Sequence, residues 1–269
     1  MPGNDLPREL AKDLEKSGFG SELAALQIFH RAAFRTVAGK VYFDKVLNSQ
    51  REVDLSAEKE LISSVSEDWM CEAVVSVVGE VKKSERPWVV FKSGTYENPY
   101  NIYLSDTLIW TQNIRAEHTV QEELAKDFLA SREHWFGHGV HEAFKKPDDL
   151  GRWFKAASSV CRAAWGAMAD SPPRQAQEKL ATVIVTQLLV VLDGRLFCAT
   201  SSEDFQLELS EISRATLLYQ ETNRSFNRRF WVDLVVLNSL PNYVDELDSR
   251  LQVVHGELTR QVAEDVANR

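Results

Sequence analysis

Cysteine is scarce in this sequence of 269 residues: only Cys71, Cys161 and Cys198 occur, far apart and without a Cys-x-x-Cys pair. With an odd number of widely spaced thiols and no such pair, neither a disulfide framework nor a zinc site built on cysteine is indicated. Such usage is typical of a reducing compartment, so we expect a cytoplasmic protein.

Long apolar runs are also missing, as is the charged and then apolar opening of a signal peptide. The longest apolar stretch, residues 183–192, is interrupted by Thr186 and Gln187 and is too short to cross a bilayer. The sequence contains no glycine-rich phosphate loop, no Gly-x-Ser-x-Gly elbow, no dinucleotide fingerprint and no repeat. These absences predict a protein that does not enter the membrane.

Positive charge is in short supply as well. Lysine and arginine number 31 against 40 aspartate and glutamate, and 31 − 40 gives a net charge of −9. As a whole, a chain with this balance does not attract nucleic acid or anionic membranes, which disfavours unselective binding to either. Any nucleic-acid site must therefore be a local basic patch.

What the sequence does have is an ordinary globular composition, with 44% hydrophobic and 26% charged residues, enough for a sizeable core. Its most informative stretch covers residues 51–93. Asp54 lies there in an alternating run, and the apolar run 73–78 leads to Glu80 and Lys82. Both runs predict strands, and alternation along the second places Glu80 and Lys82 on one face. If the two strands pair, the three charged side chains meet at their common end.

That set of side chains has a specific chemistry. Two carboxylates held close together repel each other unless a cation lies between them, and a site with only oxygen ligands suits a hard ion such as Mg²⁺. A neighbouring lysine can orient a water molecule or neutralise charge that develops on a phosphate. The pattern therefore favours metal-assisted chemistry on a phosphate ester.

The same stretch resembles the core of the PD-(D/E)XK nuclease superfamily, the restriction-endonuclease-like fold. Asp54 matches the first acid, and Glu80-Val81-Lys82 matches the Glu-x-Lys signature. Val53 stands where the superfamily name has proline. Residues 83–88, which read Lys-Ser-Glu-Arg-Pro-Trp, are similar to the continuation in one branch of these proteins. The resemblance covers about residues 6–91.

The resemblance implies a Mg²⁺-dependent endonuclease, a phosphodiesterase acting on DNA, with Mn²⁺ as an alternative ion. Asp54 and Glu80 would bind the ion, and the carbonyl of Val81 would complete the site. Lys82 would position the attacking water. Many members carry a further acid on the first core helix, and Glu22 matches it by order and spacing; the structural alternative is a glutamate favoured by the helix dipole. Three cations are expected to contact backbone phosphate: Lys83, Arg86 and Lys92.

The resemblance also implies an α/β fold, a restriction-endonuclease-like mixed central β-sheet flanked by helices on both faces, with additional helices and strands in the C-terminal half. We expect a single domain over residues 1–269. Its expected parts are a motif-bearing core at about 6–92, a helical insertion at about 117–170, and strands and a helix at about 180–269.

Two other classes of function stay open. In the first, the nuclease fold is a binding or assembly module that does not cut, which the acidic balance favours. In the second, a histidine face binds a transition metal and the Asp54 cluster is a surface ion-pair network. That face needs an unbroken helix, which two interrupting glycines oppose. The histidines, spaced i, i+4 and i+7, are His134, His138 and His141.

Three further predictions concern single elements. A buried strand over 180–192 followed by Asp193-Gly194 predicts a hairpin with 195–199. Asp44 is expected on an exposed polar face, with a role as an extra metal ligand as the alternative. The terminal helix, 242–268, has an apolar stripe that must dock on its own domain or on a second subunit. Because nucleases that cut both strands commonly pair two sites and twofold dimers are the commonest assembly, we predict a homodimer. The stripe consists of Leu247, Leu251, Val254, Leu258 and Val262.

Overall fold

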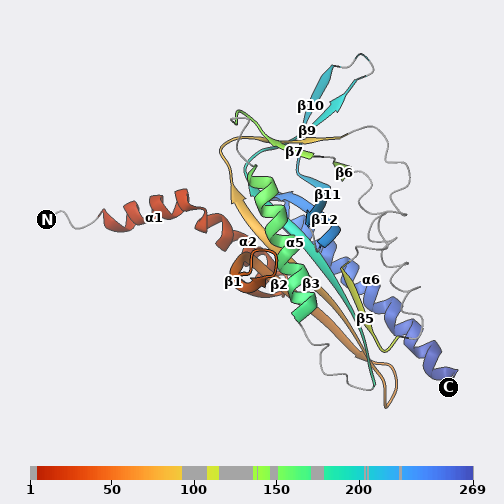
Figure 1. Ribbon diagram of the computed structural model, residues 1–269. Coiled ribbons are helices and arrows are strands. Elements are labelled where there is room, and N and C mark those ends of the chain that lie inside the picture. Colours follow the sequence, from red (N-terminus) through yellow and green to blue (C-terminus); the bar gives the residue numbers. More distant parts are fainter. Residues whose placement is uncertain are drawn as a thin grey trace.

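The structure of the protein, a computed structural model, describes residues 5–92, 108–114, 136–137, 139–145, 151–170, 179–202, 204, 206–223 and 226–268. These residues form a mixed α/β structure with a large mixed sheet, a smaller sheet and four α-helices (Figure 1). None of the four helices is long and apolar enough to cross a membrane. The helices are α1 (Leu6–Ser17), α2 (Phe19–Arg31), α5 (Arg152–Asp170) and α6 (Leu240–Ala267), the last preceded by a short 3-10 turn, η2 (Leu237–Ser239).

The strands of the large sheet are β1 (Arg35–Asp44), β2 (Ser49–Ser64), β3 (Met70–Lys83), β5 (Ile109–Gln112), β6 (Phe136–Gly137), β8 (Leu180–Asp193), β11 (Arg214–Asn223) and β12 (Phe226–Val236). Their order is β1-β2-β3-β8-β12-β11-β6, with β5 paired to β8 beside this path. β1, β2 and β3 form an antiparallel meander, and β8 runs parallel to β3 along the whole length of both strands. β12 is parallel to β8, and β11 is antiparallel to β12.

The strands of the small sheet are, in order, β10 (Leu207–Ile212), β9 (Leu196–Ser201), β4 (Trp88–Phe91) and β7 (Gly139–Glu142). In the chain β4 follows β3 and β9 follows β8, and β4 and β9 again pair in parallel. The central parallel pair of the large sheet thus bends and continues into the small sheet. The carboxyl ends of β3 and β8 lie at this junction.

The predicted hairpin at Asp193-Gly194 is wrong, because β8 and β9 belong to different sheets and do not pair with each other. Glycine is required at position 194 by close packing against a neighbouring segment, and not by a hairpin turn. A Cβ atom built on it would lie 2.5 Å from the carbonyl oxygen of Ser84 in the neighbouring bend. The amide of Ser84 donates to the carbonyl of Asp193 at 2.9 Å, which holds the two bends together.

The substitution Gly194→Ala is expected to destabilise the protein by roughly 1–3 kcal/mol, because the added methyl group meets backbone and both bends must shift. Urea unfolding gives the measurement. The matched control is Gly256→Ala in α6, where a Cβ meets nothing within 4 Å and alanine is the better helix former by about 1 kcal/mol. Equal unfolding midpoints for the two variants would contradict this account of the junction.

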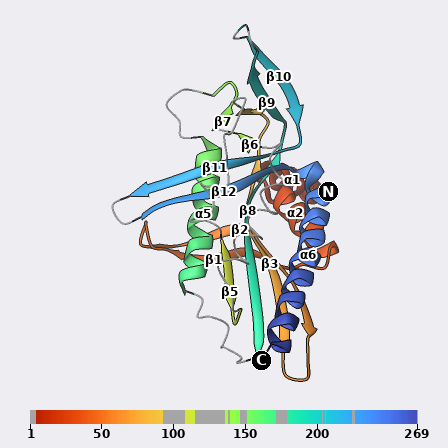
Figure 2. The same ribbon diagram turned by 90° about the vertical axis from the view of Figure 1, so that its right-hand side faces the viewer.

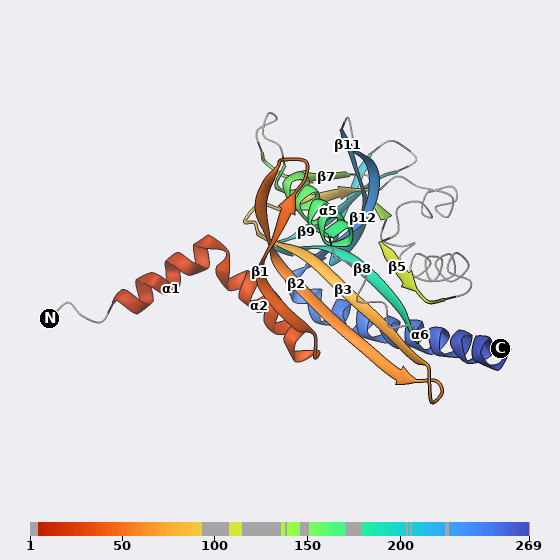
Figure 3. The same ribbon diagram turned by 60° about the horizontal axis from the view of Figure 1, so that its bottom comes forward.

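Helices cover both faces of the large sheet, α5 on one side and α6 on the other (Figure 3). The sequence of β8 explains why both faces are covered, since its side chains alternate between two hydrophobic cores. Leu188 and Val190 pack with α5, whereas Leu189 and Val191 pack with α2 and α6. All four are at most 1% exposed, as expected of a strand buried on both faces.

α6 confirms the predicted terminal helix and docks on its own chain. Four residues of its stripe are buried and the fifth, Val254, is partly buried against the same cores. The stripe therefore needs no second subunit, and the homodimer stays a prediction that this helix does not support. The four buried residues are Leu247, Leu251, Leu258 and Val262.

α1 differs from α6 in leaving its apolar stripe uncovered. The helix projects away from the sheets (Figure 1). Leu6, Leu10 and Leu14, spaced four residues apart, are 63%, 52% and 50% exposed.

Of the helical insertion expected at about 117–170, residues 117–135, 138 and 146–150 lie outside the described residues. In the described part, β6 and β7 are strands and not helix, whereas α5 is a helix as expected. Gly137 lies close against the small sheet, since a Cβ there would lie 2.3 Å from Cγ1 of Val90. His141 is exposed on β7, so an unbroken helix does not carry the three histidines. His134 and His138 lie outside the described residues.

Candidate active site

β2 is distorted at Asp54. By strand register Gly39 of β1 lies opposite this residue, with a left-handed φ of +57° that glycine adopts freely. Regular alternation would place Val53 and Leu55 on one face of the sheet. Instead Val53 packs in the core under α5 and Leu55 in the core under α2 and α6. The strand therefore turns sharply at Asp54, level with the last residues of β3.

The structure brings Asp54, Glu80 and Lys82 together. Oδ2 of Asp54 accepts hydrogen bonds from the amide of Val81, at 2.8 Å, and from Nζ of Lys82, at 3.1 Å. Nζ of Lys82 also donates to Oε2 of Glu80 at 2.5 Å. The ammonium group thus lies between the two carboxylates.

The second oxygen of Glu80 is held from the helix above it. Oγ of Ser159, on α5, donates to Oε1 of Glu80 at 2.7 Å. The hydroxyl of Tyr42, on β1, donates to the carbonyl of Ser159 at 3.4 Å. Sequence reasoning missed both residues, because Ser159 is 79 positions from Glu80 and belongs to no motif.

The electrostatics of the cluster follow from burial and from these contacts. Burial raises the pKa of Glu80, and the charge of Asp54 adds to the rise against the opposing ammonium of Lys82. Burial acts to lower the pKa of Lys82, but Glu80 and Asp54 outweigh it and raise that pKa. Lys82 therefore stays a cation. The cluster contains two acids, Asp54 and Glu80, and this one base. Solvent still reaches the cluster, since the side chains of Asp54 and Lys82 are 21% and 25% exposed.

Glu22 belongs to the same electrostatic environment. Ser21, the preceding residue in the sequence, is buried near the start of α2. Its hydroxyl donates a hydrogen bond to Oδ2 of Asp193 at the end of β8. This bond fixes the start of α2 beside the carboxyl ends of the central strands. Burial raises the pKa of Glu22, with a further rise from Asp54 and an opposing effect from Lys82.

The three cations proposed for phosphate contact follow the cluster along the chain. Lys83 and Arg86 are exposed in and beside the bend between the sheets, and Lys92, just after β4, is partly buried. The carbonyl of Lys83 accepts a hydrogen bond from Nη1 of Arg152 at 2.7 Å. Val81 itself is buried in the core.

The donor set fits a hard cation in its chemistry, with two carboxylates brought together, solvent access and a net negative charge. Among the described residues no group of three or more His, Cys, Asp or Glu side chains is arranged to hold a metal ion. The acids that the structure brings together are thus two, Asp54 and Glu80, with Glu22 in the same electrostatic environment.

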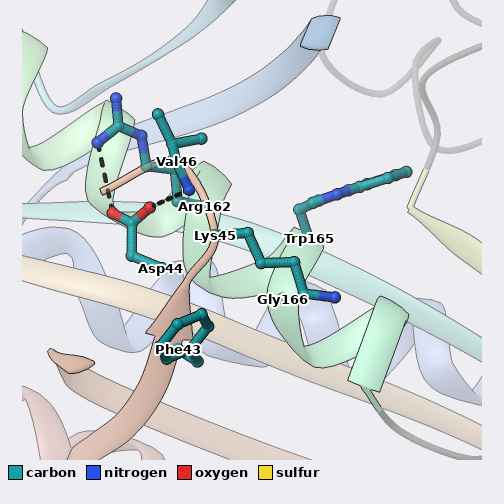
Figure 4. Close-up of a pocket in the computed structure, with 7 residues that line it drawn as sticks. All are labelled: Phe43, Asp44, Lys45, Val46, Arg162, Trp165 and Gly166. Atoms are coloured by element: carbon teal, nitrogen blue, oxygen red, sulfur yellow. Dashed lines mark hydrogen bonds and ion pairs between the residues drawn. The ribbon is translucent and has the colours of Figure 1, made fainter. Parts of the chain in front are cut away.

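A second charged cluster lies one helical turn further along α5, at a small pocket (Figure 4). Asp44 is only 1% exposed there, so its predicted place on an exposed face is wrong. Its Oδ2 pairs with Nη1 of Arg162 at 3.4 Å, and its Oδ1 accepts from the amides of Val46 and Leu47 at 2.9 and 3.0 Å. The pocket is lined by Phe43, Asp44, Lys45, Val46, Arg162, Trp165 and Gly166.

Comparison with known proteins gives no relatives for either cluster: no family model, no curated protein and no solved structure matches the chain.

Proposed function

We propose that the chain is a Mg²⁺-dependent nuclease of the restriction-endonuclease-like type that hydrolyses phosphodiester bonds of DNA. The observation that carries the proposal is Nζ of Lys82 lying between the carboxylates of Asp54 and Glu80. A strand meander, a distorted strand at the first acid, a Glu-x-Lys run at the end of the third strand and helices on both faces support it further.

Asp54 and Glu80 would hold the ion, with the carbonyl of Val81 and with Glu22 nearby. When bound, Mg²⁺ supplies a Lewis acid that stabilises phosphate charge and favours hydroxide at neutral pH. Lys82 has the separate role of holding the attacking water and offsetting charge on the phosphate.

Ser159 supports the same arrangement from α5. Its hydrogen bond holds one oxygen of Glu80 and so restricts rotation of the carboxylate. Around the cluster, Lys83, Arg86 and Lys92 would contact the DNA backbone.

The deciding experiment incubates the purified protein with plasmid, linear duplex DNA, single-stranded DNA or RNA, with Mg²⁺, Mn²⁺ or excess EDTA. We expect cleavage of DNA with either ion and none in EDTA. The reason is that the two carboxylates would bind the ion that acts as Lewis acid, and EDTA removes that ion. Cleavage that persists in EDTA, or no cleavage with either ion, would overturn the proposal.

A second candidate is a non-catalytic nuclease-fold module for binding or assembly. The exposed leucine stripe of α1 favours it, since such a stripe on a projecting helix suits a partner protein. The same assay separates the two, because this candidate cuts no nucleic acid under any condition.

A further inference from the structure

The turn end of the β1–β2 hairpin carries positive charge in a chain whose net charge is −9. We call residues 40–52, with the turn at 45–48, the hairpin tip. Lys40, Lys45 and Arg51 are exposed on it, against a single exposed acid, Glu52. Its other acid, Asp44, is buried against Arg162. The hairpin tip is therefore a local basic patch of the kind that a nucleic-acid site on this chain requires.

The hairpin tip also exposes apolar side chains. Val46 and Leu47, at the turn, are 41% and 49% exposed, and Val41 and Phe43 on β1 are 60% and 45% exposed. Isolated exposed apolar residues are common, but a group at the end of a basic ribbon marks a contact surface.

The hairpin tip is held in place. Oδ1 of Asp44 accepts from two amides of the turn, and Oδ2 of the same residue pairs with Arg162 on α5. Arg162 also donates to Oε1 of Glu221 on β11, at 2.5 Å from Nη2. A ribbon fixed in this way loses little conformational freedom when it binds.

A second basic hairpin lies beside it. The turn ends of β1–β2 and β11–β12 lie on the same side of α5 (Figure 2), joined through the contacts of Arg162. The guanidinium of Arg228, on β12, lies 4.4 Å from the centroid of the Trp165 ring, and the next residue, Arg229, is exposed. The two hairpins together extend the positive surface.

The hairpin tip starts at the active-site cluster. Asp54 lies five positions after Ser49, the turn end of β2, which is a span of roughly 17 Å in an extended strand. That span is about half of one turn of B-form DNA, which rises roughly 34 Å. A duplex with its phosphate at Asp54 therefore brings a groove within reach of the turn.

We propose that the hairpin tip is a duplex-DNA-binding ribbon, with Val46 and Leu47 in the major groove and Lys45 and Arg51 on the flanking phosphates. The inference rests on the proposed function for the position of the scissile phosphate. The major groove of B-form DNA admits a two-stranded ribbon and offers thymine methyl groups for apolar contact. The deep, narrow major groove of duplex RNA does not admit it.

The test measures binding of the full chain in EDTA, so that cleavage plays no part. Fluorescence anisotropy follows a labelled DNA duplex, the same DNA as a single strand and a duplex RNA, each over a range of salt concentrations. The two test variants are Lys45→Gln/Arg51→Gln and Val46→Ser/Leu47→Ser. Matched controls are Lys12→Gln/Lys16→Gln on α1 and Leu207→Ser/Leu209→Ser on β10, all exposed.

The two test variants should fail in different ways. Loss of two phosphate contacts lowers the salt slope of log affinity by about 1.8, because each contact contributes about 0.9. Loss of the apolar contacts lowers duplex affinity roughly tenfold and leaves the salt slope unchanged. The controls should bind as the wild type does, and the wild type should prefer duplex DNA.

Several results would overturn the inference: no binding of duplex DNA, preference for single strands or duplex RNA, test variants that bind like the wild type, or controls that lose as much affinity. Test variants that keep DNA affinity but lose a protein partner or a self-association would assign the hairpin tip to a protein contact. Binding without Mg²⁺-dependent cleavage would reject the proposed function alone, whereas cleavage with unaltered test variants would reject the inference alone.

Discussion

Replacing Asp54 with Asn, or Glu80 with Gln, is expected to lower Mg²⁺-dependent DNA cleavage by roughly 10²–10³-fold or more. Each substitution removes one of the two negative charges that face Lys82, and with it one charged ligand for the ion. Neither removes volume, so the core around β3 is kept. The measurement is the initial rate of plasmid nicking at saturating Mg²⁺.

The control for both variants is Glu85→Gln, which removes an exposed carboxylate in the bend just after the cluster. It should cut at the wild-type rate. Circular dichroism and the thermal midpoint confirm that each variant is folded. If a folded Asp54→Asn or Glu80→Gln protein cuts as fast as Glu85→Gln, the substituted carboxylate is not part of the catalytic site.

Lys82→Met is expected to lower turnover by roughly 10²–10³-fold while leaving metal binding in place. In the proposed mechanism the ammonium acts on water and phosphate and not on the ion. Its removal also takes away the cation that pairs with Asp54 and Glu80. Calorimetric titration with Mn²⁺ should therefore give an affinity equal to or higher than that of the wild type.

The matched control is Lys155→Met, an exposed lysine on α5, which should change neither turnover nor Mn²⁺ affinity. A folded Lys82→Met protein that no longer binds Mn²⁺ would contradict the assigned role. So would one that still cuts DNA at the rate of Lys155→Met.

The sequence was informative about the cluster because strand periodicity is local. Alternation along one strand placed Glu80 and Lys82 on one face, and the structure has both side chains in contact with each other. Asp54 required one further step, the pairing of two neighbouring strands. Ser159 could not be predicted, because its contact with Glu80 depends on how α5 crosses the sheet, and no local pattern encodes that crossing.

The errors have a similar physical origin. Asp193-Gly194 has the residue types of a tight turn, but Gly194 is needed for close approach to Ser84, a contact between segments 110 positions apart in the sequence. The charge of Asp44 suggested solvent exposure, and only the fold supplies the Arg162 that pairs with it. β8 was predicted well, since a mostly apolar run of this length is recognised as buried without knowledge of its partners.

α5 carries Ser159 and Arg162 three residues apart, about one turn of the helix. The first side chain holds Glu80 and the second holds Asp44 at the turn between β1 and β2. If α5 moves as a rigid helix, a shift in one contact also shifts the other, so the proposed cation site and the turn between β1 and β2 would share a coupling free energy. Such coupling is reciprocal. If a ligand at the turn changes the affinity for the cation by some factor, the cation changes the affinity for that ligand by the same factor.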